Sequence, residues 1–138
     1  MKQNEKDLLL KDLCARLPYG VKAYVRYWAN LDWKYYEGTY TVTSIHPSLN
    51  DILVTTDKSS VEVILGYDDY KIKPYLFPLS SMTDEQKEEH KDLLENQYNF
   101  DANGNIFTLQ DFYCKYHLDY RGLIPIDLAI DATGLNIY

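Results

Sequence analysis

Apolar residues in the first part of the chain recur every three or four positions, which is the spacing of one face of an α-helix. The apolar positions are Leu9, Leu10, Leu13, Cys14 and Leu17, and the charged positions on the opposite face are Lys6, Asp7, Lys11, Asp12 and Arg16. This spacing predicts an amphipathic helix over residues 5–17. Pro18 and Gly20 predict its end, because the residue before a proline is biased away from helical geometry.

Between residues 21 and 73 the pattern changes to alternation and short β-branched runs separated by turns. Five strands are predicted, over residues 21–28, 35–45, 52–56, 61–65 and 70–73, and Pro74 is expected to end the last one. Five short strands joined by tight turns favour a small antiparallel, five-stranded SH3-like β-barrel. The alternative is an open twisted sheet packed on helices.

Residues 73–83, Lys-Pro-Tyr-Leu-Phe-Pro-Leu-Ser-Ser-Met-Thr, separate this β-half from a helical half. Two prolines flank the apolar triplet in this segment, so we expect a rigid strut that joins the two halves. Thr83 and Gln86 then form a capping-box pattern, which predicts a helix to about Gln97.

The rest of the chain predicts a short hairpin and a second C-terminal helix. Asn103-Gly104 marks a tight turn between residues 98–100 and 106–107, and the segment from Thr108 to Asp111 is a second capping pattern, with Gly122 as the stop. The apolar tail, residues 123–131, is expected to pack back on the core. We therefore predict an α+β fold in a single domain, residues 1–138, in which residues 1–79 and 80–138 share one core.

Charge is distributed unevenly between the two halves. Residues 1–79 hold ten Lys/Arg and ten Asp/Glu, whereas residues 80–138 hold four and eleven, so the whole net charge of −7 lies in the second half. Such a balance repels phosphate, and direct nucleic-acid binding is not expected. The predicted helix after Thr83 carries an acidic patch, Glu85, Glu88, Glu89 and Asp92. This patch is either a solvated face or a surface that docks a basic partner or imitates nucleic-acid phosphates.

The apolar runs are too short to cross a bilayer, so no membrane association is expected. Two cysteines a hundred positions apart and a highly charged first segment predict a cytoplasmic protein with free thiols.

The sequence offers few candidate metal-binding or catalytic residues. Asp101, Asn103 and Asn105 have the spacing that begins a calcium loop, but the required glycine and the final Glu are missing. Cys114 and His117 lie one helical turn apart, but a zinc site needs four ligands and a nucleophile needs an oriented base. We predict no catalytic residues, no metal, no cofactor and no small-molecule ligand.

Aromatic residues are the other bias of this chain, which holds 14 tyrosines. The candidate binding residues are Trp28, Trp33, Tyr35, Tyr36, Tyr67 and Tyr70, which could line a groove for an extended peptide where they are not core. Lys22 and Arg26 alternate with Tyr24 and Trp28 and could stack bases, but two cations are only weak evidence for nucleic-acid binding. The leading hypothesis is a non-enzymatic interaction module that binds a protein partner. The alternative is an acidic inhibitor that blocks a nucleic-acid-binding protein.

Three blocks of sequence carry a resemblance to known proteins. They are residues 8–22 (LLLKDLCARLPYGVK), residues 73–83 (KPYLFPLSSMT) and residues 119–125 (DYRGLIP) with their continuation to residues 136–138 (NIY). In these blocks the chain resembles a family of short proteins of no assigned activity from gut anaerobic bacteria and their phages or mobile elements. The resemblance implies a mobile-element context and a cytoplasmic location, and it brings no catalytic residues.

Overall fold

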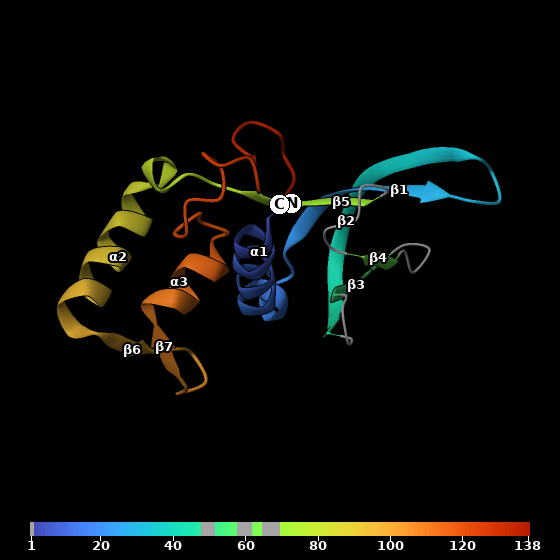
Figure 1. Ribbon diagram of the computed structural model, residues 1–138. Helices are drawn as coiled ribbons and strands as arrows, with labels where there is room; N and C mark the ends of the chain where they lie inside the picture. Colours follow the sequence, from blue (N-terminus) through green and yellow to red (C-terminus); the bar gives the residue numbers. More distant parts are fainter. Residues whose placement is uncertain (1, 48–51, 58–61, 65–69) are drawn as a thin grey trace.

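The computed structural model describes residues 2–47, 52–57, 62–64 and 70–138. The described part of the chain is elongated, with the tip of a long hairpin at one end, helix α2 at the other and helix α1 between them (Figure 1). The helices are α1 (Gln3–Arg16), α2 (Asp84–Asn96) and α3 (Leu109–Lys115), with 3₁₀ turns η1 (Leu17–Tyr19) and η2 (Leu79–Ser81). The strands are β1 (Lys22–Ala29), β2 (Lys34–Pro47), β3 (Ile52–Thr56), β4 (Glu62–Ile64), β5 (Tyr70–Leu76), β6 (Tyr98–Phe100), β7 (Ile106–Thr108) and β8 (Ile130–Asp131).

Six strands form one open, mixed sheet in the order β4-β3-β2-β1-β5-β8. All neighbours are antiparallel except β8, which runs parallel to β5. No closed barrel is found among the described strands, so the SH3-like barrel is corrected to the twisted-sheet alternative. The long strand β2 pairs first with β1 and then with β3, with a register shift between Val42 and Ser44, and it curves around α1 (Figure 1).

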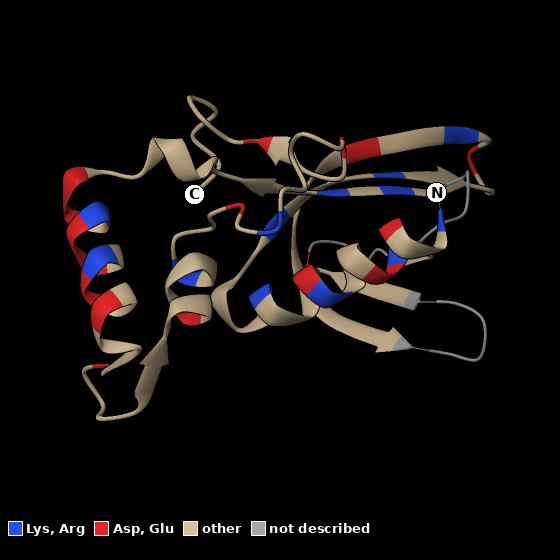
Figure 2. Ribbon diagram, turned by 60° about the vertical axis from the view of Figure 1, so that its left-hand side comes forward, with Lys and Arg blue, Asp and Glu red and all other residues tan. Residues whose placement is uncertain are grey.

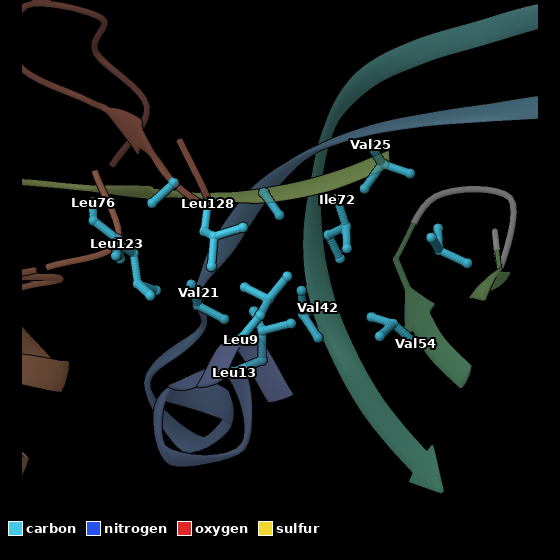
Figure 3. Packing of buried hydrophobic residues seen from close by; sticks show 13 residues of the cluster. Leu9, Leu13, Val21, Val25, Val42, Val54, Ile72, Leu76, Leu123 and Leu128 are labelled. Atoms are coloured by element: carbon cyan, nitrogen blue, oxygen red, sulfur yellow. The ribbon is translucent and has the colours of Figure 1, made fainter. Parts of the chain in front are cut away.

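The main hydrophobic core lies between α1 and the concave face of this sheet (Figure 3). Its buried members are Leu9, Leu13, Val21, Ala23, Val25, Val42, Val54, Val63, Ile72, Leu76, Leu123, Leu128 and Ala129. The last three belong to the apolar tail, so the expected packing of the tail on the core is confirmed. Burial of this apolar surface is the main force that holds α1 to the sheet.

A second hydrophobic cluster lies between α2 and α3, where Leu93, Phe112 and Leu118 are buried. The main core draws on both halves of the chain, and this second cluster is an addition to it within the helical half. Segment 73–83 joins the two clusters: Leu76 lies in the first, and Phe77 packs against the second. The Phe77 amide donates to the His117 carbonyl at 2.8 Å.

Several local predictions can be checked against these elements. The capping boxes at Thr83 and Thr108 and the β6–β7 hairpin are confirmed. Strand β5 continues through Pro74 to Leu76, so the predicted strand end is wrong. Helix α3 ends at Lys115 and not at Gly122, and two residues later His117 has a positive φ of 56°.

None of the helices in the described ranges is long and apolar enough to cross a membrane.

Candidate functional site

The pairing of β1 with β2 and β5 decides which side chains share a face. Val25 points into the core (Figure 3), so its strand neighbours Arg26 and Tyr24 point to the opposite side, called here the outer face. Arg26 is paired with Glu37 on β2 and with Lys71 on β5, and Tyr24 is paired with Lys73. The outer face therefore gathers cations and rings from three strands.

The six predicted binding residues do not form one groove. Trp28, Trp33 and Tyr35 lie together on the outer face: the Trp28 ring is 4.9 Å from the Tyr35 ring and 6.3 Å from the Trp33 ring, centroid to centroid. Tyr36 lies on the inner face, where its ring stacks on Tyr27 at 5.7 Å.

Tyr70 also packs against the main core. Tyr67 lies outside the described residues. Three of the six predicted residues thus remain together as a candidate surface, because period-two alternation sends neighbours in a strand to opposite faces.

The turn between β1 and β2 presents large apolar side chains to solvent. Leu31 is 98% exposed and Trp33 is 80% exposed. Hydrogen bonds order this turn: the Asp32 amide donates to the Ala29 carbonyl, and the Tyr36 hydroxyl donates to the Asp32 carboxylate at 2.6 Å. These apolar groups are therefore held at the end of a projecting hairpin (Figure 1). Sequence reasoning included Trp33 but missed Leu31, since a single leucine in a loop has no pattern.

A pocket of about 470 Å³ opens on the outer face beside this hairpin. Its lining consists of Tyr24, Arg26, Tyr35, Glu37, Lys71, Lys73 and Ile130. The Arg26 guanidinium lies 3.9 Å from the centroid of the Tyr35 ring, a close cation–π contact. The volume falls within the usual range of ligand sites.

Two of the charges in and around the pocket are already engaged. The Tyr24 hydroxyl donates to the Glu37 carboxylate at 2.5 Å, and this hydrogen bond is the largest cause of the raised pKa of Tyr24. Lys73 forms an ion pair with Asp127 at 2.8 Å, which lowers the pKa of that carboxyl. Lys71 and Lys73 were missed by sequence reasoning, because they join the site only through the pairing of β5 with β1.

The acidic patch lies on α2, at the end of the molecule far from the β1–β2 turn (Figures 1 and 2). Glu85, Glu88 and Asp92 are exposed, whereas Glu89 is half-buried and accepts a hydrogen bond from the Tyr116 hydroxyl at 2.8 Å. Burial and then Glu89 raise the pKa of Tyr116 to about 12. Glu89 therefore has a packing role that the other three carboxylates do not share.

Cys114 and His117 have properties opposite to those of a nucleophile and its base. Burial raises the pKa of the Cys114 thiol, and burial lowers the pKa of His117 to about 4. At neutral pH the thiol is protonated and the imidazole is neutral. The His117 ring stacks on Tyr138 at 3.6 Å between centroids. Among the described residues, no group of three or more His, Cys, Asp or Glu side chains could hold a metal ion.

Asp12 and Arg16 were expected on the charged face of the first helix, but both are fully buried. Arg16 Nη2 donates to the Leu118 carbonyl at 2.6 Å, and Asp12 Oδ1 lies 3.3 Å from Arg121 Nε. Residues 8–22 and 119–125 thus meet at this ion pair. Its contacts join α1 to the segment after α3, which is a structural role.

Comparison with known proteins finds no family model that matches this chain, no similar curated protein and no similar solved structure.

Proposed function

We propose that this chain is a non-enzymatic interaction module that binds a protein partner through the β1–β2 hairpin. The single observation that carries the proposal is the pair Leu31 and Trp33, which are 98% and 80% exposed at the end of a hydrogen-bonded turn. Exposing a tryptophan and a leucine in one short turn to water has a free-energy cost that a partner would remove. The mobile-element context implied by the family resemblance belongs to the same proposal.

Neighbouring side chains support a binding role for this turn. Trp28 contacts the Trp33 ring and is itself packed against Tyr35, so the turn is presented on paired strands. Tryptophan and tyrosine are the residues most often found at the centres of protein interfaces.

The experiment is affinity capture from a lysate of the native host, followed by mass spectrometry and by a binding measurement with the purified partner. We expect Leu31→Ser with Trp33→Ala to weaken binding by roughly thirtyfold, the effect of losing an interface tryptophan. The matched control is Leu94→Ser with Phe100→Ala, which removes two exposed apolar groups, 58% and 65% exposed, from the other end of the molecule. Equal loss of partner binding in both double variants, or unchanged binding by Leu31→Ser with Trp33→Ala, would refute the proposal.

The second candidate function is an acidic inhibitor that occupies the site of a nucleic-acid-binding protein. It is favoured by Glu85, Glu88 and Asp92, which are exposed and lie three and four positions apart on α2, the spacing of one helix face. It requires a complex that weakens steeply with salt and is lost in Glu88→Lys with Asp92→Lys. Glu89 is left unchanged in this variant because it holds Tyr116.

A further inference from the structure

We propose that the pocket on the outer face binds a carboxylate of the protein partner, and that Arg26 and Lys71 are the residues that hold it. The inference rests on the proposed function, because it names the chemistry of the segment that the hairpin would bind. The occupant is an extended peptide with an acidic side chain two residues away from an apolar one.

The charge of the pocket is the first argument. Its lining contains three cations, Arg26, Lys71 and Lys73, and one carboxylate, Glu37. Asp127 pairs with Lys73, so the local charge is +1 in a chain whose net charge is −7. Figure 2 shows several Lys and Arg segments on the paired strands, and Asp and Glu interleaved with fewer Lys along α2. A partner with negative charge is therefore attracted to this face and repelled by the opposite end.

The hydrogen-bonding capacity of two of the cations is the second argument. Lys73 is paired with Asp127, whereas neither Arg26 nor Lys71 forms an ion pair with another of the described residues. The cation–π contact with Tyr35 occupies one face of the Arg26 guanidinium and leaves the N–H groups, which lie in its plane, to bind a carboxylate in a bidentate manner. Lys71 is exposed beside it.

The spacing along the hairpin gives the third argument. Arg26 and Trp28 are two positions apart on β1, so their Cα atoms are separated by roughly 7 Å along the strand. An extended peptide lying along this strand has the same spacing between its residues i and i+2. A carboxylate over Arg26 would then place an apolar side chain at Trp28 and the adjoining Trp33.

The same contacts favour a peptide over single-stranded nucleic acid. Glu37 in the pocket repels any anion, so it disfavours a backbone with one negative charge on every nucleotide more than a peptide with a single carboxylate among neutral residues. Arg26 covers one face of the Tyr35 ring, which a base would need for stacking.

Fluorescence anisotropy with labelled synthetic peptides tests the inference on the full chain. The probe is a peptide that repeats Glu-Ser-Phe-Ser three times, in which Glu and Phe are two residues apart. We expect it to bind roughly tenfold or more tightly than the versions with Gln or Lys in place of Glu, and more tightly than an oligothymidylate of equal length. Arg26→Gln with Lys71→Gln should weaken its binding roughly tenfold.

The matched control is Lys87→Gln with Lys91→Gln, which changes the net charge equally on α2 and should leave binding unchanged. Equal binding of the Glu and Gln peptides, tighter binding of oligothymidylate, or equal weakening by both pairs of substitutions would overturn the inference. If no peptide binds while the Leu31→Ser, Trp33→Ala variant still loses its captured partner, the inference fails and the proposed function stands. If that variant also keeps its partner, both fail.

Discussion

Asp12 and Arg16 form an ion pair within α1 that solvent does not reach: Oδ2 lies 2.8 Å from Nε, and both side chains are 0% exposed. The pair is extended by Arg121, whose Nε lies 3.3 Å from the second Asp12 oxygen, and by the Leu118 carbonyl, which accepts from Arg16 Nη2. One carboxylate therefore faces two guanidinium groups at the junction between the sheet half and the helical half.

Removing the carboxylate alone should be strongly destabilising. Asp12→Ala leaves the buried Arg16 charge without its counterion, and we expect the free energy of unfolding to fall by about 3–5 kcal/mol in urea denaturation. The apolar pair Asp12→Leu with Arg16→Met should be less damaging than the single change. The control is Asp7→Ala on the exposed face of the same helix, expected to change stability by about 0.5 kcal/mol or less. A similar small effect for Asp12→Ala would contradict this account.

The pKa of His117 predicts a pH dependence of stability. Burial lowers that pKa from 6.5 to about 4 in the folded chain. Between these values the unfolded chain binds more protons than the folded one, so stability is complete above pH 6.5 and is lost as the pH falls toward 4. Allowing for solvent at the ring, the loss is on the order of 2 kcal/mol.

The measurement for His117 is urea unfolding at several pH values between 4 and 7, on the natural chain and on His117→Asn. Asparagine tolerates the positive φ of this position and does not titrate. The difference in stability between the two chains should depend on pH in this window. A difference that is constant from pH 4 to 7 would show that His117 is not the titrating group.

The two thiols should differ in reactivity. Burial raises the pKa of both thiols, but Cys14 is accessible on α1 whereas Cys114 is buried. Alkylation with iodoacetamide near pH 7.5, followed by mass spectrometry, should modify Cys14 first and Cys114 only on unfolding. Cys14→Ser isolates the slow thiol. Rapid alkylation of Cys114 in the folded Cys14→Ser variant would contradict this expectation and would support a catalytic role for Cys114.

The Tyr138 hydroxyl joins two strands of the sheet. It donates to the Tyr75 carbonyl at 2.8 Å and accepts from the Lys22 amide at 2.9 Å. Tyr138→Phe should therefore reduce the free energy of unfolding by about 1–2 kcal/mol in urea denaturation. Tyr98→Phe, on a side chain that is 47% exposed, is the matched control and should have almost no effect.

Much of the local structure could be predicted from short stretches of sequence. The capping boxes at Thr83 and Thr108, the turn at Asn103-Gly104 and the alternation over β1 each depend on contacts between residues a few positions apart. Such contacts are determined by side-chain chemistry and backbone geometry that every occurrence of the motif shares. The acidic character of α2 follows from composition alone.

Pairings between distant residues decided what the local patterns could not. The register of β1 against β5 brings Lys71 and Lys73 to Arg26 and Tyr24. Tyr36 and Tyr70 are both paired with Tyr27, on the face opposite to Trp28. The burial of Asp12 and Arg16 depends on Leu118 and Arg121, about a hundred residues away. The sequence by itself determined where most helices and strands begin, because those signals are local, but β8 exists only through its pairing with β5. Only the tertiary structure decided which side chains are buried and which charges are paired, because both depend on residues that are distant in the chain and meet when it folds.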